Sequence, residues 1–180
     1  MARPSSAARR YAEAAFEIAE RDGATDLWLS QLSRVGQALS DGDLVRALED
    51  PAVPLEKRSS ALRQALGPDA LPPVRNLLEL VLRRRRLEEV PRIATEFRRL
   101  YNRRAGIVEA TAISAAPLSD TDVAELRRRL VDIAGSQVDL SLEVDPALIG
   151  GIAVRIGDRL IDGSVRGRLE RLRNRLTATA

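Results

Sequence analysis

LIGGIAVRIGDRLIDGS, residues 148–164, is the segment that decides the fold of the second half of this 180-residue chain. It contains four glycines and two aspartates, and aliphatic residues fill most of the space between them. Ile152–Ile156 predicts a strand that turns at a Gly-Asp pair into a second strand, Arg159–Ile161. Because Ser164 is a preferred N-cap residue, a helix is predicted to begin directly after it. The segment therefore predicts a β-hairpin followed by a helix.

The glycines of this segment do not match a phosphate-binding loop. Such a loop needs a lysine and a Ser or Thr at the start of a helix directly after its glycines. No lysine follows Gly150 and Gly151, a strand comes next, and the spacing also differs from the dinucleotide-binding pattern. We expect instead that the glycines accept the positive φ that turns require. The predicted turn and cap residues are Gly150, Gly151, Gly157, Asp158, Asp162, Gly163 and Ser164.

Three aspartates near these turns, Asp145, Asp158 and Asp162, raise the alternative of an acid–base set or a hard-metal site. Each neighbours a proline or a glycine in a predicted turn, where an Asp side chain ordinarily bonds nearby backbone N–H groups. The chain also contains no histidine and no cysteine, which removes thiolate nucleophiles, imidazole or thiolate metal sites and the commonest general base. We therefore predict no catalytic residue, no metal and no cofactor.

Arginine supplies almost all of the positive charge, since Lys57 is the one lysine among 29 basic residues. The 26 carboxylates reduce the formal net charge to +3. The run Arg83–Arg86 raises the alternative of a basic nucleic-acid-binding adaptor. Four consecutive helical residues point in different directions, however, acidic residues follow at once, and few aromatic residues are present for base stacking. A solvated helix end is the favoured interpretation, and nucleic acid is not a predicted partner.

The first half of the chain has a helical pattern from Ser5 to about Gly106. Ser5 or Ser6 can cap a first helix, and Thr25 can cap a second. Large apolar residues recur on one face of the second helix at Trp28, Leu32, Val35 and Leu39.

Further helices are predicted over residues 43–49 and 55–66, each followed by Pro or Gly. A longer helical stretch starts at Pro72, and within it Pro91 suits the first turn of a sixth helix better than a helix interior. Six helices with short connections predict a bundle over residues 1–105.

After this point the pattern changes to that of a mixed fold. Residues 107–114 are strand-like, Ser119 with Asp122 forms a capping-box start for a helix, and Gly135 ends that helix. In the stretch 137–144, apolar and polar residues alternate perfectly, which is typical of a half-buried strand. The apolar positions of that strand are Val138, Leu140, Leu142 and Val144.

The fold class predicted by these patterns is α+β and mostly α. An N-terminal six-helix bundle, residues 1–105, is followed by a small C-terminal α+β domain, residues 106–180.

The most specific segment, IGGIAVRIGDRLIDGSVRGRLERLR at residues 149–173, combines a Gly-Asp hairpin, an Ile-Asp-Gly-Ser turn and an arginine-bearing helix. RRYAEAAFEIA, RNLLELVLRRRRLEEVP and ISAAPLSD precede it in that order. In these features nearly the whole chain resembles the delta-subunit family of bacterial F-type ATP synthases, whose mitochondrial counterpart is the oligomycin-sensitivity-conferring protein. The arginine run Arg83–Arg85 departs from the more mixed residues usual in that family.

This resemblance implies a non-catalytic stator, or peripheral-stalk, subunit of a proton-translocating ATP synthase. It implies that the N-terminal bundle binds the N-terminal helices of alpha subunits, and that the C-terminal domain holds the C-terminal helices of the b-subunit stalk. Such a subunit lies at the cytoplasmic face of the cell membrane as a peripheral protein, attached only indirectly through the complex.

A groove for the alpha subunit is predicted between the first and fifth helices. Small alanines would let a partner helix approach closely, while Tyr11 and Leu80 would supply apolar anchors. The alternative is that these residues all belong to the core of the bundle itself. The predicted groove residues share one face of each helix and are Tyr11, Ala14, Ile18, Leu77, Leu80 and Arg84.

Overall fold

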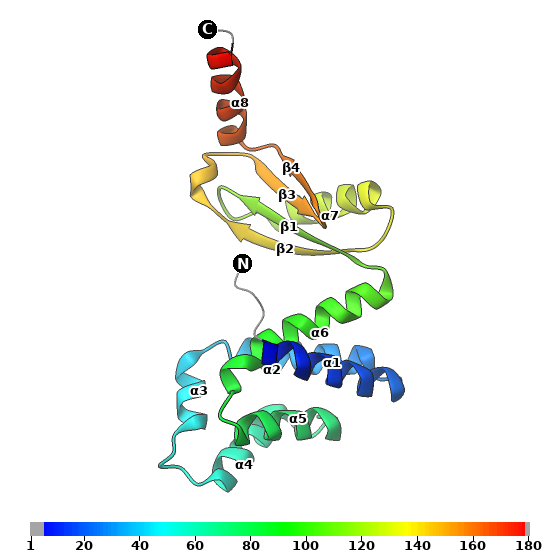
Figure 1. The fold of residues 1–180 in the computed structure, drawn as a ribbon, viewed down its shortest axis with the longest axis vertical. Coiled ribbons are helices and arrows are strands. Elements are labelled where there is room, and N and C mark those ends of the chain that lie inside the picture. Colours follow the sequence, from blue (N-terminus) through cyan, green and yellow to red (C-terminus); the bar gives the residue numbers. More distant parts are fainter. Residues whose placement is uncertain (1–5, 179–180) are drawn as a thin grey trace. The chain divides into compact units, whose positions relative to one another are not determined.

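The computed structural model of the chain describes residues 6–178 and divides into two compact units, with the boundary between Tyr101 and Asn102 (Figure 1). The described residues form eight α-helices and four strands, so the fold is α+β and mostly α, as the sequence predicted. Each unit has its own cluster of buried apolar side chains.

The helices of the first unit begin and end within a few residues of their predicted bounds. Pro91 is the second residue of the last of them, which confirms its prediction, because the fixed φ of proline suits a first helical turn. The helices are α1 (Ser6–Arg21), α2 (Thr25–Ala38), α3 (Gly42–Glu49), α4 (Leu55–Leu66), α5 (Pro72–Arg83) and α6 (Val90–Ala105), with a short 3₁₀ helix at Leu87–Glu89.

The prediction that Thr25 caps α2 is wrong. Thr25 is already the first helical residue, and the N-cap is Ala24, which has no polar side chain to accept a hydrogen bond. The chain reverses one residue earlier than expected, since Gly23 has a φ of 63° and the Ala24 N–H still bonds the Ala19 carbonyl at 2.9 Å. The spacing of apolar residues along the helix does not predict this early reversal. The predicted cap at Ser5 lies outside the described residues.

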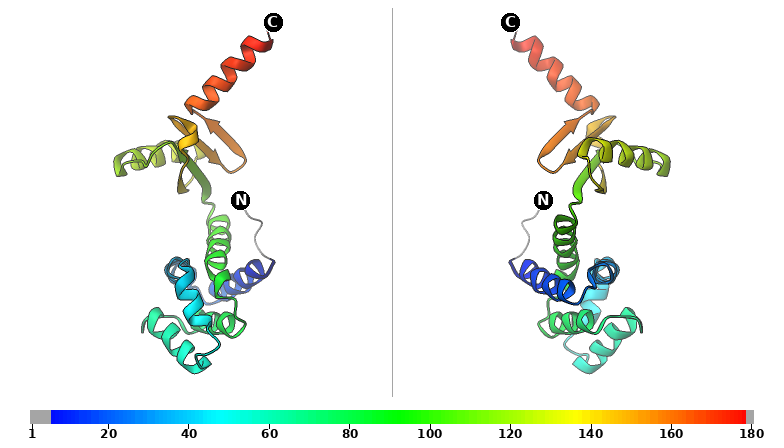
Figure 2. Two further views of the ribbon diagram at one scale, coloured as in Figure 1. Left: turned by 90° about the vertical axis from the view of Figure 1, so that its left-hand side faces the viewer. Right: turned by 90° about the vertical axis from the view of Figure 1, so that its right-hand side faces the viewer.

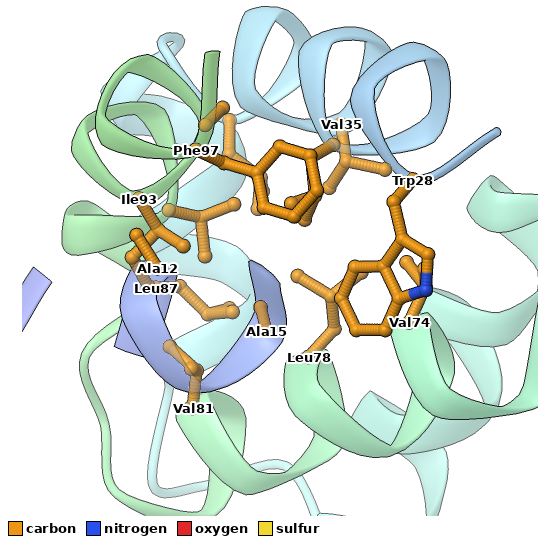
Figure 3. Close-up of a cluster of buried hydrophobic side chains, with 14 of the residues drawn as sticks. Ala12, Ala15, Trp28, Val35, Val74, Leu78, Val81, Leu87, Ile93 and Phe97 are labelled. Carbon is orange, nitrogen blue, oxygen red and sulfur yellow. The ribbon is translucent and has the colours of Figure 1, made fainter. Parts of the chain in front are cut away.

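Aromatic rings join three helices in the core of the first unit, and Figure 3 labels two of these residues, Trp28 and Phe97. The Phe97 ring of α6 stacks on Trp28 of α2, with the ring centroids 5.9 Å apart and the planes 10° apart. Phe16 of α1 meets Phe97 edge-on, with centroids 5.4 Å apart. The apolar face predicted for α2 is buried along its whole length, at Trp28, Leu32, Val35 and Leu39.

A buried amide fixes the start of α5 beside α2. Gln31 donates to the carbonyl of Asp69 and accepts from the N–H of Leu71, both at 3.0 Å. Because both ends of the amide are hydrogen-bonded, its burial carries little penalty. The connection from α4 to α5 is therefore held against α2.

The second unit is built on a four-stranded mixed sheet. The strand order is β2-β1-β3-β4, with β1 and β2 parallel and the other neighbours antiparallel. The parallel pair is connected by α7, as a parallel pair requires a long crossover. The elements are β1 (Val108–Ser114), α7 (Asp120–Ala134), β2 (Val138–Val144), a 3₁₀ turn (Pro146–Leu148), β3 (Ile152–Ile156), β4 (Arg159–Asp162) and α8 (Val165–Ala178).

The predicted capping box at the start of α7 is confirmed. The Ser119 hydroxyl accepts the Asp122 N–H at 3.2 Å, and the Asp122 carboxylate accepts the Ser119 N–H at 3.3 Å. At the other end, Gly135 has a left-handed backbone with a φ of 67° and ends the helix. Both ends of α7 are therefore specified by local sequence.

β2 corrects the expectation of a half-buried strand. Val138 is buried and Leu140 partly buried, but Leu142 and Val144 are 46% and 51% exposed. β2 is an edge strand, and the cluster of buried residues that includes α7 covers only its first half. The alternating pattern predicts which side of the strand is apolar, whereas coverage of that side depends on the neighbouring helix.

Gly36 is expected to be required where α2 meets α6. A Cβ at this position would lie 2.9 Å from the Ala94 Cβ and 3.4 Å from the Pro91 Cα. Alanine ordinarily stabilises a helix interior relative to glycine by about 1 kcal/mol. Here Gly36→Ala must push the two helices apart, and we expect a net loss of about 1 to 3 kcal/mol in chemical denaturation.

Gly42→Ala provides the matched control, since Gly42 is the first residue of α3 and a Cβ there meets nothing within 4 Å. Its stability should be unchanged or slightly raised. If both alanine variants unfold at the wild-type midpoint, α2 and α6 do not approach each other as described.

Candidate functional site: the groove between helices α1 and α5

Helix α1 carries two neighbouring stripes of small and apolar residues. The inward stripe is buried almost completely and consists of alanines at i, i+4, i+7 and i+11, namely Ala8, Ala12, Ala15 and Ala19. Because alanine extends only one carbon from the backbone, the helix axis can lie close to the core beneath it. The stripe next to it therefore remains near the surface of the unit.

This second stripe faces a matching stripe on α5 across a groove of about 570 Å³. Both stripes repeat with the spacing that keeps residues on one face of a helix. The stripe on α1 consists of Ala7, Tyr11, Ala14 and Ile18. The stripe on α5 consists of Pro73, Leu77 and Leu80, and it continues to the C-cap residue Arg84.

The groove is apolar with basic side chains along it. Trp28, which is 1% exposed, and Ala15 also contribute to its lining. Arg10, Arg84 and Arg86 add three guanidinium groups. A partner suited to these walls has an apolar stripe to fill the groove and carboxylates that meet the arginines.

The structure brings all six predicted groove residues together. None of the six belongs to the buried core, although Tyr11, Ile18 and Leu77 pack against its edge. Leu80 is 42% exposed and Ala14 is also exposed. The six predicted residues thus border the core, whereas Trp28 and Ala15 belong to the core and also line the groove.

Sequence reasoning missed several residues of the lining. Ala7 and Pro73 extend the two predicted stripes by one turn, so the helical spacing could have found them. Arg86 lies beyond the end of α5, where helical spacing no longer applies. The remaining additions are Arg10, Trp28 and Asn76.

The arginine run does not form one continuous basic strip. α5 ends at Arg83, and Arg85 takes a left-handed backbone with a φ of 54°. The N–H groups of Arg85 and Arg86 then bond the carbonyls of Leu82 and Val81, at 2.9 and 3.1 Å, as in a helix-ending Schellman motif. Arg84 and Arg86 line the groove, while Arg85 reaches the carbonyl of Glu49 at 3.4 Å.

The predicted turn before the last helix is closed by a compact hydrogen-bond network. The buried hydroxyl of Ser164 accepts the Gly167 N–H at 3.0 Å and donates to Asp162 Oδ1 at 2.6 Å. The same Asp162 oxygen accepts the Ser164 N–H at 2.9 Å. These hydrogen bonds from Ser164 lower the pKa of Asp162, and the positive charge of Arg171 adds to the effect.

The glycines of this segment serve two different purposes, which corrects the expectation that all of them supply positive φ. Gly151 and Gly157 do so, with φ of 76° and 54°, and Gly157 with the exposed Asp158 turns β3 into β4. At Gly163 the reason is space, because a Cβ there would lie 3.1 Å from the Ile152 carbonyl oxygen. At Gly150 a Cβ would lie 3.2 Å from a methyl group of Val165. Close packing of this kind cannot be inferred from a turn pattern.

Comparisons with known proteins place the whole chain in one family. A family model of the ATP synthase delta (OSCP) subunit matches residues 7–176. The chain is 36% identical over 173 residues to the ATP synthase subunit delta of Shouchella clausii (strain KSM-K16), which covers 95% of this chain and 96% of the relative. It is 34% identical over 180 residues to the ATP synthase subunit delta of Cupriavidus taiwanensis, with 99% of each chain covered.

A solved structure supports the same assignment. The chain is similar to one in the cryo-EM structure of the Toxoplasma gondii mitochondrial ATP synthase hexamer, with a TM-score of 0.70 and 28% sequence identity. The match covers 94% of this chain and 97% of that chain. The protein therefore belongs to the ATP synthase delta (OSCP) subunit family, as the sequence resemblance predicted.

Within that family it is a structural subunit of the peripheral stalk of an F-type ATP synthase and has no catalytic role. Among residues 6–178, none of the helices combines the length and the apolar character that crossing a membrane requires.

Ser164→Ala is expected to destabilise the start of α8. The substitution removes the oxygen that caps the Gly167 N–H, and a lost cap costs about 0.5 to 2 kcal/mol. Denaturant unfolding together with amide hydrogen exchange in α8 measures the effect. Thr177→Ala, at an exposed site near the other end of the same helix, is the control and should change little. Equal behaviour of the two variants would contradict the cap.

The stabilising effect of Asp162 is expected to depend on pH. The pKa of Asp162 in the folded protein lies below the ordinary value of 3.8. At pH values between the folded pKa and 3.8, the folded state therefore binds fewer protons than the unfolded state. The carboxylate therefore stabilises the fold above about pH 4, and this contribution is lost as the pH falls through the folded pKa. The stability difference between wild type and Asp162→Asn should shrink in acid. A difference that stays constant from neutral pH to pH 3 would contradict this.

Proposed function

We propose that α1 to α6 form one six-helix bundle whose groove binds the N-terminal helix of an ATP synthase alpha subunit. The observation that carries this proposal is the pair of matching stripes on α1 and α5, which leave an apolar groove beside a complete core. An amphipathic helix that lays its apolar face into such a groove is a recurring mode of recognition. The small side chains of Ala7 and Ala14 leave room for the partner backbone.

The residues that would anchor the alpha-subunit helix differ in how closely they pack against the core. Tyr11 packs against the core and lines the groove, so its ring is fixed before a partner binds. Leu80 is more exposed and would be covered by the partner. Arg84 and Arg86 would attract carboxylates on the partner helix. Tyrosine and arginine are enriched among the residues that dominate binding energy at interfaces, and Leu80 would add apolar contact area beside them.

The second unit, in this proposal, holds the C-terminal helices of the b-subunit stalk. Its support is the number of large apolar side chains left exposed in a small unit, which is typical of a surface that a partner covers. They occur on β2, on β4 and along α8, at Leu142, Val144, Leu160, Ile161, Leu169, Leu172 and Leu176. Binding alpha with one unit and b with the other would hold the catalytic head against rotation.

The same proposal places the subunit at the cytoplasmic face of the cell membrane, as a peripheral protein held there by the rest of the complex. It needs no cofactor, because the subunit contributes contacts and no chemistry. The arginine run gives the nucleic-acid alternative no comparable support, since its side chains divide between the groove and the carbonyl of Glu49.

Leu80→Ala tests the groove directly. Because Leu80 is 42% exposed, its truncation should cost about 1 kcal/mol of folding stability or less. Binding of a peptide with the sequence of the alpha-subunit N-terminal helix should weaken by about 1 to 4 kcal/mol, the range of interface hot spots. Isothermal titration beside a thermal melt separates the two effects.

Leu27→Ala is the matched control, since Leu27 of α2 is 54% exposed and lies outside the groove lining. It should bind the peptide like wild type. A Leu80→Ala variant that unfolds early but binds normally once folded would mean that Leu80 belongs to the core, and the groove would be rejected.

A further inference from the structure

The last helix of the chain carries an apolar seam that no part of the described structure covers. Figures 1 and 2 show α8 as a single helix that extends from the sheet of the second unit. Its exposed apolar residues follow a spacing of four, three and four, which is the repeat of a coiled-coil seam. They are Val165, Leu169, Leu172 and Leu176, with exposed fractions of 39%, 53%, 54% and 67%.

Arginines flank this seam on both sides. If Leu169 and Leu176 occupy a positions and Val165 and Leu172 occupy d positions, every e and g position of the helix is an arginine. The acidic residue of the helix, Glu170, falls at a b position, where its carboxylate accepts a hydrogen bond from Arg166 Nε at 3.0 Å. The flanking residues are Arg166, Arg168, Arg173 and Arg175.

α8 is held firmly at its first turn. The Ser164 cap joins Gly167 to Asp162, and the Val165 N–H bonds the Gly150 carbonyl at 2.9 Å. Arg171 also reaches back to the carbonyl of Asp162 at 3.3 Å. The seam is therefore present on a formed helix before any partner arrives, which reduces the entropy lost on binding.

A second copy of this chain is a poor partner for the seam. Residues at e and g face each other across a two-helix coiled coil and determine which partners pair. Two copies of α8 would place arginine opposite arginine in either orientation, parallel or antiparallel, and like charges at such contacts disfavour pairing. The arginines beside the seam therefore favour a partner helix whose sequence differs from that of α8.

We propose that α8 is a docking helix that pairs with a partner helix bearing apolar residues at a and d and carboxylates at e and g. This inference rests on the proposed function, in which the second unit holds the stalk, and it names the contacting element and the chemistry of the partner. Arginine suits this role because its guanidinium group is always charged and can bind a carboxylate with two hydrogen bonds.

Two designed peptides test the inference on the full-length protein. Both have about three heptads with leucine and isoleucine in the seam, and they carry either glutamate or lysine at e and g. The glutamate peptide should bind about tenfold more tightly, since four exposed ion pairs each contribute a few-fold at most. This preference should decrease as salt is raised.

Charge reversal at two of the four flanking positions should cancel the selection. Arg168→Glu with Arg173→Glu leaves two arginines and two glutamates beside the seam, so this variant is expected to bind the two peptides about equally. Leu169→Asp with Leu172→Asp should abolish binding of both peptides. Arg128→Glu, at an exposed site on α7, is the matched control and should keep the wild-type preference. Circular dichroism checks that each variant keeps its helix content.

Several outcomes would overturn the inference. Equal affinity of the wild type for the two peptides, or a preference that charge reversal leaves unchanged, excludes selection by the flanking arginines. Concentration-dependent dimers of wild type that Leu172→Asp disrupts would show that the seam pairs with itself. If only binding to vesicles with anionic phosphatidylglycerol responds to the α8 variants, the helix is a membrane-surface element instead.

A pull-down experiment distinguishes this inference from the proposed function. It measures whether the immobilised protein retains purified alpha and b subunits. If b is retained equally by wild type and by the Arg168→Glu, Arg173→Glu variant, the proposed function stands and the role of α8 is rejected. If the peptide selection holds but neither variant nor wild type retains b, the stalk assignment fails and the docking helix stands.

Discussion

The close approach of α1 to the core of the first unit is the constraint on which the groove depends. Alanines at four successive inward positions let α1 lie near the stacked rings of Trp28 and Phe97. A larger residue at any of those positions would lift the helix and separate the stripe that carries Tyr11 from the stripe that carries Leu80. The groove is therefore shaped largely by buried residues, of which Ala15 and Trp28 also form part of its lining.

The two units expose apolar surface in opposite forms. In the first unit the apolar side chains line a concave groove beside a finished core, with arginines along it. In the second unit, α7 packs on the sheet, and α8 presents an exposed apolar seam between arginines. In the proposed function, one unit receives a helix and the other offers one, so a partner would cover the apolar surface that each unit exposes to water.

Sequence reasoning predicted the elements because their signals are local. The capping box at Ser119, the left-handed Gly135 and the buried face of α2 each follow from residues within a few turns of one another. It failed where the deciding contact is distant in the sequence. The alternation in β2 could not reveal that α7 stops short of Val144, and no turn rule reports that Gly163 lies against the Ile152 carbonyl. For the groove, helical spacing identified the stripes, whereas Arg86 enters the lining through the chain reversal at Arg85.

The arginines beside the groove and beside the α8 seam fix how these surfaces respond to acidity. A guanidinium group keeps its proton far above physiological pH, the chain has no histidine, and Lys57 is its one lysine. The positive charge on both surfaces is accordingly constant over the whole range in which partner carboxylates are ionised. Contacts of this kind between stator subunits would keep their strength when the pH near a proton-translocating enzyme changes.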